Sequence, residues 1–182
     1  MPHLNLNIKK ENMAQLREIY FAGGCFWGTE HFFKQIRGVE KTEVGYANGK
    51  IENPTYEQVR TNTTGFAETV RVFYHPETVT LKLLLELFFK TIDPTSMNRQ
   101  GEDVGTQYRT GVYYIHSEDR AVIEEAIKEL SCHYQAPIVI EVEPLQNFYN
   151  AEDYHQDYLD KNEGGYCHIR PELFKIARDA NR

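Results

Sequence analysis

The sequence predicts an α+β fold in which helices cover a mixed sheet. Two observations support this fold class. Strand-like and helix-like segments follow one another in the order β-α-β-β-α-β-α-β, and the first six match the split β-α-β, ferredoxin-like arrangement. No repeat, low-complexity segment or Pro/Gly/Ser-rich linker divides the 182 residues, a length typical of one domain. We therefore expect a single domain over 1–182.

The first half of the chain supplies one helix and three strands. Residues 17–22 (REIYFA) predict a short strand. Apolar side chains then recur with helical spacing after Cys25, and Gly38 is a residue type that ends helices. Strand-like segments follow at 39–47 and 67–74. Cys25 is therefore expected at or near the first turn of the helix.

The second half supplies two helices and two strands. Residues 80–90 (TLKLLLELFFK) are apolar on most of a helical circumference, which predicts a well-buried helix. A strand is predicted at 108–115, and Ser117 followed by two acidic residues is a preferred helix start. Residues 137–142 (PIVIEV) predict the last strand.

Three long segments lack a periodic pattern: 48–66, 92–107 and 144–182. Long ordered loops in a compact domain are often functional. We expect 144–182 to form an irregular C-terminal segment, and 1–16 to form an N-terminal extension.

Composition excludes several classes of protein. The 20 basic and 27 acidic residues give a net charge of −7 without a Lys/Arg-rich block, so nucleic acid is not an expected partner. The amino terminus lacks the apolar core of a signal peptide, and no later run approaches the ~18 apolar residues of a membrane span. We expect a soluble, cytoplasmic protein without a membrane partner. Its three cysteines indicate thiol chemistry, metal binding or burial rather than a disulfide framework.

The stretch FAGGCFWG places Cys25 at the predicted change from strand to helix. The positive end of a helix dipole favours a thiolate, whereas an ordinary thiol has a pKa of ~8.5. Gly23 and Gly24 permit a sharp turn and leave the sulfur uncrowded. The pattern predicts a nucleophile with a lowered pKa. A buried structural cysteine in a glycine-rich turn is the alternative.

The hexapeptide GGCFWG resembles the active-site signature of the A-type peptide methionine sulfoxide reductases. Five further motifs resembling that family follow in the same order, and together they cover residues from about 18 to 168. They are GYANGKIENPTYEQV at 45–59, GFAETVRVFY at 65–74, DPTSMNRQGEDVGTQYR at 93–109, AEDYHQDYL at 151–159 and GYC at 165–167. This chain has Phe66 where the family usually has His.

The resemblance implies a catalytic domain that reduces methionine S-sulfoxide, free and in oxidised proteins, as repair of oxidative damage. Cys25 is the implied nucleophile, which becomes a sulfenic acid as methionine is released. Glu68 is the implied proton donor. Because a carboxyl with a pKa of ~4.3 is almost wholly ionised at pH 7, the pKa of Glu68 must be raised by ~2 units or more. Strand alternation sets Glu68 beside Phe66 and Val70, an apolar setting, although a surface glutamate on a half-exposed strand fits the same pattern.

The other implied roles concern the substrate. Phe26 and Trp27 would hold its methyl group, although aromatic residues at helical spacing are more often part of a core. Tyr56 and Tyr108 would donate hydrogen bonds to the sulfoxide oxygen, and Asp103 would support the site and contact the substrate backbone.

The two remaining cysteines are expected to differ. Cys167 in NEGGYCHIR resembles the family's recycling position, and Gly164 and Gly165 would let its segment move. The resemblance implies a transient disulfide between Cys25 and Cys167 that thioredoxin reduces, with no cofactor and no metal, in a monomer. Cys132, at the end of a predicted helix, is expected to be buried or half-buried and without a role.

Other classes stay open on the residues alone. A cysteine hydrolase would pair Cys25 with a His and an Asn or Asp, but no histidine lies in a hydrolase signature. A zinc site could use Cys132-His133, Cys167-His168 and His155, although the chain has no C-x-x-C pair. A ferredoxin-like binding domain could use its aromatic residues, 13% of the chain, as a recognition surface.

Overall fold

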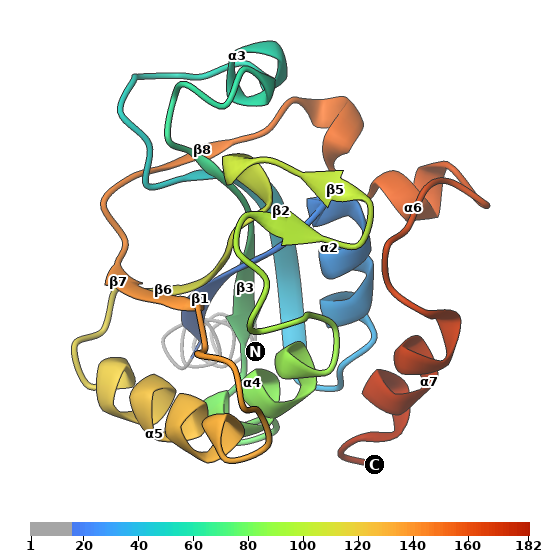
Figure 1. Ribbon diagram of the computed structural model, residues 1–182. Helices are drawn as coiled ribbons and strands as arrows, with labels where there is room; N and C mark the ends of the chain where they lie inside the picture. Colours follow the sequence, from blue (N-terminus) through green and yellow to red (C-terminus); the bar gives the residue numbers. More distant parts are fainter. Residues whose placement is uncertain (1–15) are drawn as a thin grey trace, which may run out of the picture.

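The computed structural model describes residues 16–182, so nearly all of the expected N-terminal extension lies outside the described part. Within it, six strands form one sheet in the order β7-β6-β1-β3-β2-β8, shown in Figure 1. The strands are β1 (Arg17–Gly23), β2 (Val39–Ala47), β3 (Ala67–Tyr74), β6 (Thr110–Tyr114), β7 (Glu141–Pro144) and β8 (Phe148–Asn150). The four central strands, β6, β1, β3 and β2, are antiparallel to one another and have the ferredoxin-like order, while β7 at the edge lies parallel to β6. The predicted mixed sheet with a ferredoxin-like core is confirmed.

Two helices meet on one face of the sheet. The Phe21 ring on β1 lies 4.4 Å from the Phe33 ring of α2 (Phe26–Lys34) and 4.9 Å from the Phe88 ring of α4 (Leu81–Phe89). The start of α4 is capped by Thr80, whose hydroxyl accepts a hydrogen bond from the backbone N–H of Leu83. A third helix, α5 (Asp119–Ser131), packs beside α4 (Figure 1). These helices occur where the sequence predicts them.

Two predicted strands have different bounds. The strand expected at 137–142 begins only at Glu141. Before it, the backbone N–H of Val139 donates a hydrogen bond, 2.8 Å long, to the carbonyl of Pro94 in the loop that follows α4. The strand expected at 108–115 begins at Thr110, because Thr106–Tyr108 form a 3₁₀ turn, η1.

The loop segments contain short elements that the sequence analysis did not predict. Residues 48–66 include α3 (Tyr56–Arg60), whose first turn is closed by a reciprocal capping box between Thr55 and Gln58. Residues 92–107 include a small hairpin of β4 (Arg99–Gln100) and β5 (Asp103–Val104).

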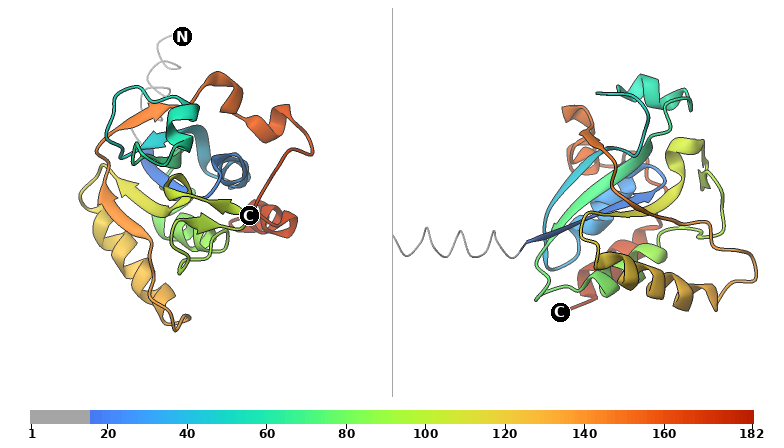
Figure 2. Two further views of the ribbon diagram at one scale, coloured as in Figure 1. Left: turned by 45° about the horizontal axis from the view of Figure 1, so that its top comes forward. Right: turned by 90° about the vertical axis from the view of Figure 1, so that its left-hand side faces the viewer.

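The expectation of an irregular segment at 144–182 is wrong. This segment contains β8, a 3₁₀ turn η2 (Asp153–His155), α6 (Tyr158–Lys161) and α7 (Pro171–Asp179). Leu173, Phe174, Ile176 and Ala177 recur with helical spacing in α7, and Leu173 and Ala177 are buried, so the sequence contained a helical pattern that the sequence analysis did not use. After β8 the segment passes α2 and ends in α7, which also packs on α2 (Figure 2).

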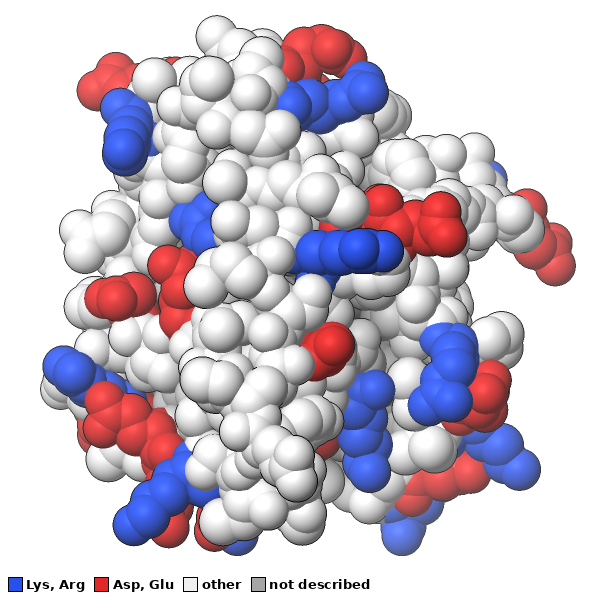
Figure 3. Space-filling view, viewed as in Figure 1, with Lys and Arg blue, Asp and Glu red and all other residues white. Residues whose placement is uncertain are grey.

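The surface of the described residues carries both charges. Figure 3 shows Lys and Arg interspersed with Asp and Glu over one face, without a continuous patch of either sign. Among residues 16–182, no helix combines the length and apolar character needed to cross a bilayer.

Candidate active site

Cys25 occupies the turn between β1 and α2. It is the N-cap residue of α2, and its side chain is buried, with 6% exposed. Gly24 makes this turn possible because its φ is +87°, a conformation that other residues rarely adopt. A Cβ at position 24 would also lie 2.8 Å from the Cβ of Gln100. The glycine therefore allows the cysteine to sit directly at the start of the helix, as predicted.

The expected lowering of the Cys25 pKa is wrong. Burial raises the pKa of this thiol well above its ordinary value, and Glu68, when it is ionised, raises it further. The backbone N–H of Trp27 acts in the opposite direction but does not compensate for the lost solvation. Cys25 is therefore a neutral thiol in the substrate-free protein.

Glu68 lies within hydrogen-bond reach of the same helix start. Its Oε1 accepts a hydrogen bond, 3.2 Å long, from the backbone N–H of Phe26. Its side chain is buried, and its Oε2 has no hydrogen-bond partner among the described residues. Burial raises the pKa of Glu68 to about 8, and the charge of Asp103 contributes. The carboxyl is thus protonated at neutral pH, as the sequence analysis required, and a surface position is excluded.

Phe66 accounts for part of the apolar setting of Glu68. Phe66 and Val70 belong to the main core, whereas the intervening Ala67 belongs to a smaller cluster on the opposite face. The Phe66 ring fills the space beside Gly49, where a Cβ would lie 2.2 Å from a ring carbon. The predicted alternation along β3 therefore holds around Glu68.

Two tyrosines and an aspartate surround the same point. Tyr56 begins α3 and Tyr108 ends η1, and both side chains are half-buried. Burial raises the pKa of both hydroxyls, that of Tyr56 to about 12, and Glu68 and Cys25, when they are ionised, raise each further. Both hydroxyls are therefore protonated donors near the two groups. Asp103 on β5 accepts a hydrogen bond, 2.7 Å long, from the hydroxyl of Tyr166.

The two aromatic residues after Cys25 have different environments. Phe26 is 1% exposed and belongs to the main core. Trp27 is only partly buried, and its ring stacks on that of Tyr158 with the ring centres 3.7 Å apart. Its Nε1–H donates to Nδ1 of His155, 3.0 Å away. Trp27 therefore has a fixed orientation and a solvent-accessible part, whereas Phe26 packs within the core against Tyr46 and His155.

Cys167 and Cys132 lie in different parts of the structure. Cys167 is half-buried beside the first turn of α2, where a Cβ on Gly28 would lie 3.0 Å from its Sγ. Cys132 follows α5 as its C-cap residue and is exposed, so the expectation that it is buried or half-buried is wrong. The apolar face of α5 continues to Leu130, which is partly buried against the core, and Cys132 lies beyond it. All three thiols are free.

Two further residues complete this region, Glu152, which the sequence analysis did not single out, and His155, which it considered only as a zinc ligand. His155 is fully buried between the rings of Phe26, Tyr56 and Tyr154, and burial lowers its pKa. Glu152 accepts hydrogen bonds from the Tyr46 hydroxyl and the Tyr56 backbone N–H. Both residues lie in the AEDYHQDYL motif, which was the available signal. The motif contains both residues, but only the folded structure shows which groups they contact.

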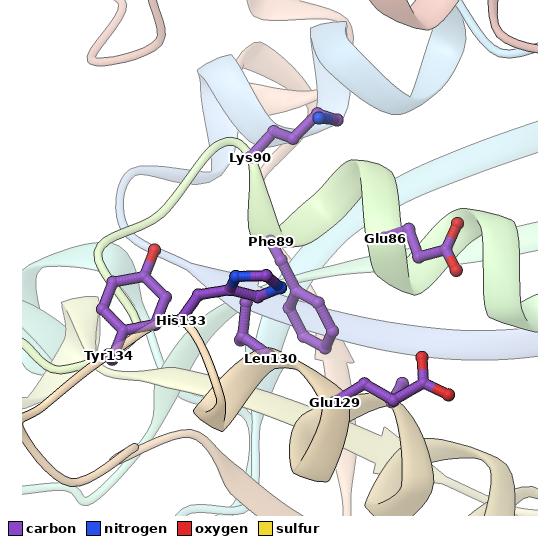
Figure 4. Close-up of a pocket in the computed structure, with 8 residues that line it drawn as sticks. Glu86, Phe89, Lys90, Glu129, Leu130, His133 and Tyr134 are labelled. Carbon is purple, nitrogen blue, oxygen red and sulfur yellow. The ribbon is translucent and has the colours of Figure 1, made fainter.

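The candidate zinc donors are not brought together. In the described part of the chain, no group of three or more His, Cys, Asp or Glu side chains could hold a metal ion. A surface pocket between α4 and α5 is shown in Figure 4, where His133 points toward Phe89 and Leu130. None of the residues predicted for the active site lines this pocket.

Comparison with known proteins gives consistent matches. The sequence model of the family "Peptide methionine sulfoxide reductase" matches residues 17–181. The peptide methionine sulfoxide reductase MsrA of Clostridium acetobutylicum is 54% identical over 160 residues, which cover 88% of this chain and 99% of that protein. The reduced form of Mxr1 from Saccharomyces cerevisiae superposes with a TM-score of 0.82 at 40% identity, covering 86% of this chain and 92% of that one. Mxr1 in complex with Trx2 matches with a TM-score of 0.58 at 28% identity, covering 80% and 86%.

Proposed function

This chain belongs to the peptide methionine sulfoxide reductase family, and from that premise we propose which residues carry out the reduction and how. The protein is an oxidoreductase that reduces methionine sulfoxide. Cys25 is the nucleophile and Glu68 the proton donor. The observation that carries this assignment is the buried Glu68 carboxyl. It is protonated at neutral pH, and it accepts a hydrogen bond from the backbone N–H of Phe26, the residue next to Cys25.

Glu68 and Cys25 together account for the protons that the reaction needs: one is given to the sulfoxide oxygen, and one is taken from the thiol. Both are neutral in the substrate-free protein, because burial raises the pKa of each. As Cys25 Sγ attacks the sulfoxide sulfur, Glu68 protonates the sulfoxide oxygen and becomes a carboxylate that can accept the thiol proton. The oxygen ends on Cys25 as a sulfenic acid, and methionine leaves. Cys25 is oxidised, the sulfoxide is reduced, and Glu68 recovers its proton.

The surrounding residues bind the substrate. The hydroxyls of Tyr56 and Tyr108 donate hydrogen bonds to the sulfoxide oxygen, and their raised pKa values keep them protonated. Trp27, oriented by Tyr158 and His155, forms the apolar wall for the methyl group, together with Phe26. Asp103 contacts the substrate backbone. This arrangement selects the S epimer, in free methionine sulfoxide and in oxidised proteins.

The sulfenic acid is then discharged within the chain. Cys167 attacks Cys25, a disulfide forms, and the sulfenic hydroxyl leaves with the Cys167 proton as water. The position of Cys167 beside Gly28, in the first turn of α2, supports this step. Thioredoxin reduces the disulfide, in keeping with the solved complex of Mxr1 with Trx2. The whole cycle takes place in one cytoplasmic, monomeric catalytic domain.

An NADPH-coupled thioredoxin assay on the two resolved sulfoxide epimers tests the proposal. We expect turnover of the S epimer only, and none with the Cys25→Ser variant, whose folding is checked by circular dichroism. Turnover of the R epimer would contradict the stereochemical assignment. Appreciable turnover by Cys25→Ser would remove Cys25 as the nucleophile.

A further inference from the structure

Three consecutive residues in the C-terminal segment are held by three different elements. The Tyr166 hydroxyl donates to Asp103 Oδ2 on β5, at 2.7 Å. Cys167 lies against Gly28 of α2. His168 Nε2 lies 3.0 Å from the carbonyl oxygen of Gly23 at the end of β1. We call residues 166–168 the strap, because they cross the start of α2 beside Cys25.

The chain on either side of the strap differs in how it is held. Ile169, directly after the strap, is 4% exposed and belongs to the core. Before it, Gly164 has a φ of +79°, and a Cβ there would meet nothing within 4 Å. The amino-terminal end of the strap therefore follows a loosely packed turn, and the contact of Tyr166 with Asp103 fixes that end.

The hydrogen bond between Tyr166 and Asp103 holds the strap in place, and it can break because Tyr166 is accessible to water. Burial and the bond to Asp103 raise the pKa of the Tyr166 hydroxyl, so it stays a donor at neutral pH. A hydrogen bond to a carboxylate is stronger than one between neutral groups. Tyr166 is nevertheless 44% exposed, so water can replace its partner when the strap moves.

We propose that Tyr166 is a positioning residue for the recycling step, because its hydrogen bond to Asp103 holds Cys167 against the first turn of α2. This inference rests on the proposed function, in which Cys167 attacks the Cys25 sulfenic acid. The S–O bond of Cys25 breaks, the S–S bond forms, and water leaves. Asp103 is also the proposed contact of the substrate backbone, so a bound peptide and Tyr166 use the same carboxylate in turn.

The test separates the reductase step from the recycling step. The reduced Tyr166→Phe variant is mixed with N-acetyl-methionine S-sulfoxide amide, without thioredoxin, and quenched at successive times. The sulfide product reports the first step, and the Cys25–Cys167 disulfide, mapped by peptide mass spectrometry, reports the second. We expect product formation within about twofold of wild type and disulfide formation slower by on the order of tenfold.

Tyr134→Phe is the matched control, since Tyr134 is 40% exposed and lines the pocket between α4 and α5. It should change neither rate. A second measurement compares Tyr166→Phe and Asp103→Ala with the double variant. If the hydrogen bond is the cause, their effects on disulfide formation are not additive.

A wild-type rate of disulfide formation in Tyr166→Phe would overturn the inference, and so would additive effects in the double variant. Equal slowing of both steps by Tyr166→Phe would also overturn it, because the residue would then serve the site as a whole. Failure of the wild-type protein to form product, or a disulfide to Cys132, would instead contradict the proposed function.

Discussion

The carboxyl of Glu68, on the central strand β3, accepts a hydrogen bond from the backbone N–H of Phe26, the first residue of α2, at 3.2 Å. This contact joins a strand and a helix that are far apart in the sequence. It sets the acid beside the residue that follows Cys25. The helix start favours a negative charge at this point, but full burial has the larger effect, and the carboxyl keeps its proton up to about pH 8.

Replacing Glu68 by Gln should slow the reductase step by a factor on the order of 10²–10⁴. Glutamine retains an oxygen that can accept from Phe26 but has no acidic proton. The measurement is single-turnover formation of methionine in a quenched-flow experiment.

Glu30→Gln is the matched control for this variant. Glu30 is also a buried carboxyl on the face of α2 toward the sheet, and burial also raises its pKa, but its oxygens accept from Thr42 and the Asp157 backbone. This control should change stability and leave the reductase rate nearly unchanged. An unchanged rate in Glu68→Gln would show that another group delivers the proton.

Glu68 should also make the stability of the protein depend on pH. Its folded pKa of about 8 lies above the unfolded value of ~4.3, so between these values the folded state binds the extra proton. The contribution of Glu68 to stability is therefore fully present below about pH 4 and is lost as pH rises through 8.

Scanning calorimetry of wild type and Glu68→Gln from pH 4 to pH 8 tests this linkage. Because Gln does not titrate, the variant should gain thermal stability relative to wild type as the pH rises. A stability difference that is constant across this range would mean that Glu68 titrates alike in the folded and unfolded chains.

The sequence predicted the framework better than the environment of the site. The strands and helices that carry Cys25 and Glu68 follow from local patterns, such as the apolar residues of α4 and the glycine turn before Cys25. The raised pKa of Cys25 does not follow from a local pattern, because it results from burial in the folded chain and from the negative charges of ionisable groups distant in the sequence, Glu68 before Asp103 and Cys167. α7 is a different case, because Leu173, Phe174, Ile176 and Ala177 recur with helical spacing and this helix could have been predicted from the sequence.

Trp27→Ala should weaken substrate binding and raise KM roughly tenfold, with a smaller effect on kcat, because the apolar wall is lost from a partly exposed position. Steady-state kinetics with methionine S-sulfoxide give both constants. Trp27→Phe, which can still stack on Tyr158 but cannot bond to His155, should have an intermediate effect. A fall in melting temperature without a change in KM would show that Trp27 serves the core alone.

Replacing Cys167 and replacing Cys132 should have different effects on turnover. Cys167→Ser should release one equivalent of methionine per enzyme and then stop with thioredoxin, because the Cys25 sulfenic acid has no resolving thiol. Cys132→Ser should turn over like wild type, since Cys132 is exposed at the end of α5, where its Sγ donates a hydrogen bond to the carbonyl of Lys128, 3.6 Å away. A burst assay gives the stoichiometry, and peptide mapping identifies the disulfide.

Sustained thioredoxin-supported turnover by Cys167→Ser would contradict the assignment of the recycling thiol. A mapped disulfide between Cys25 and Cys132 would require the carboxyl end of α5 to approach α2, and would transfer the recycling role to Cys132.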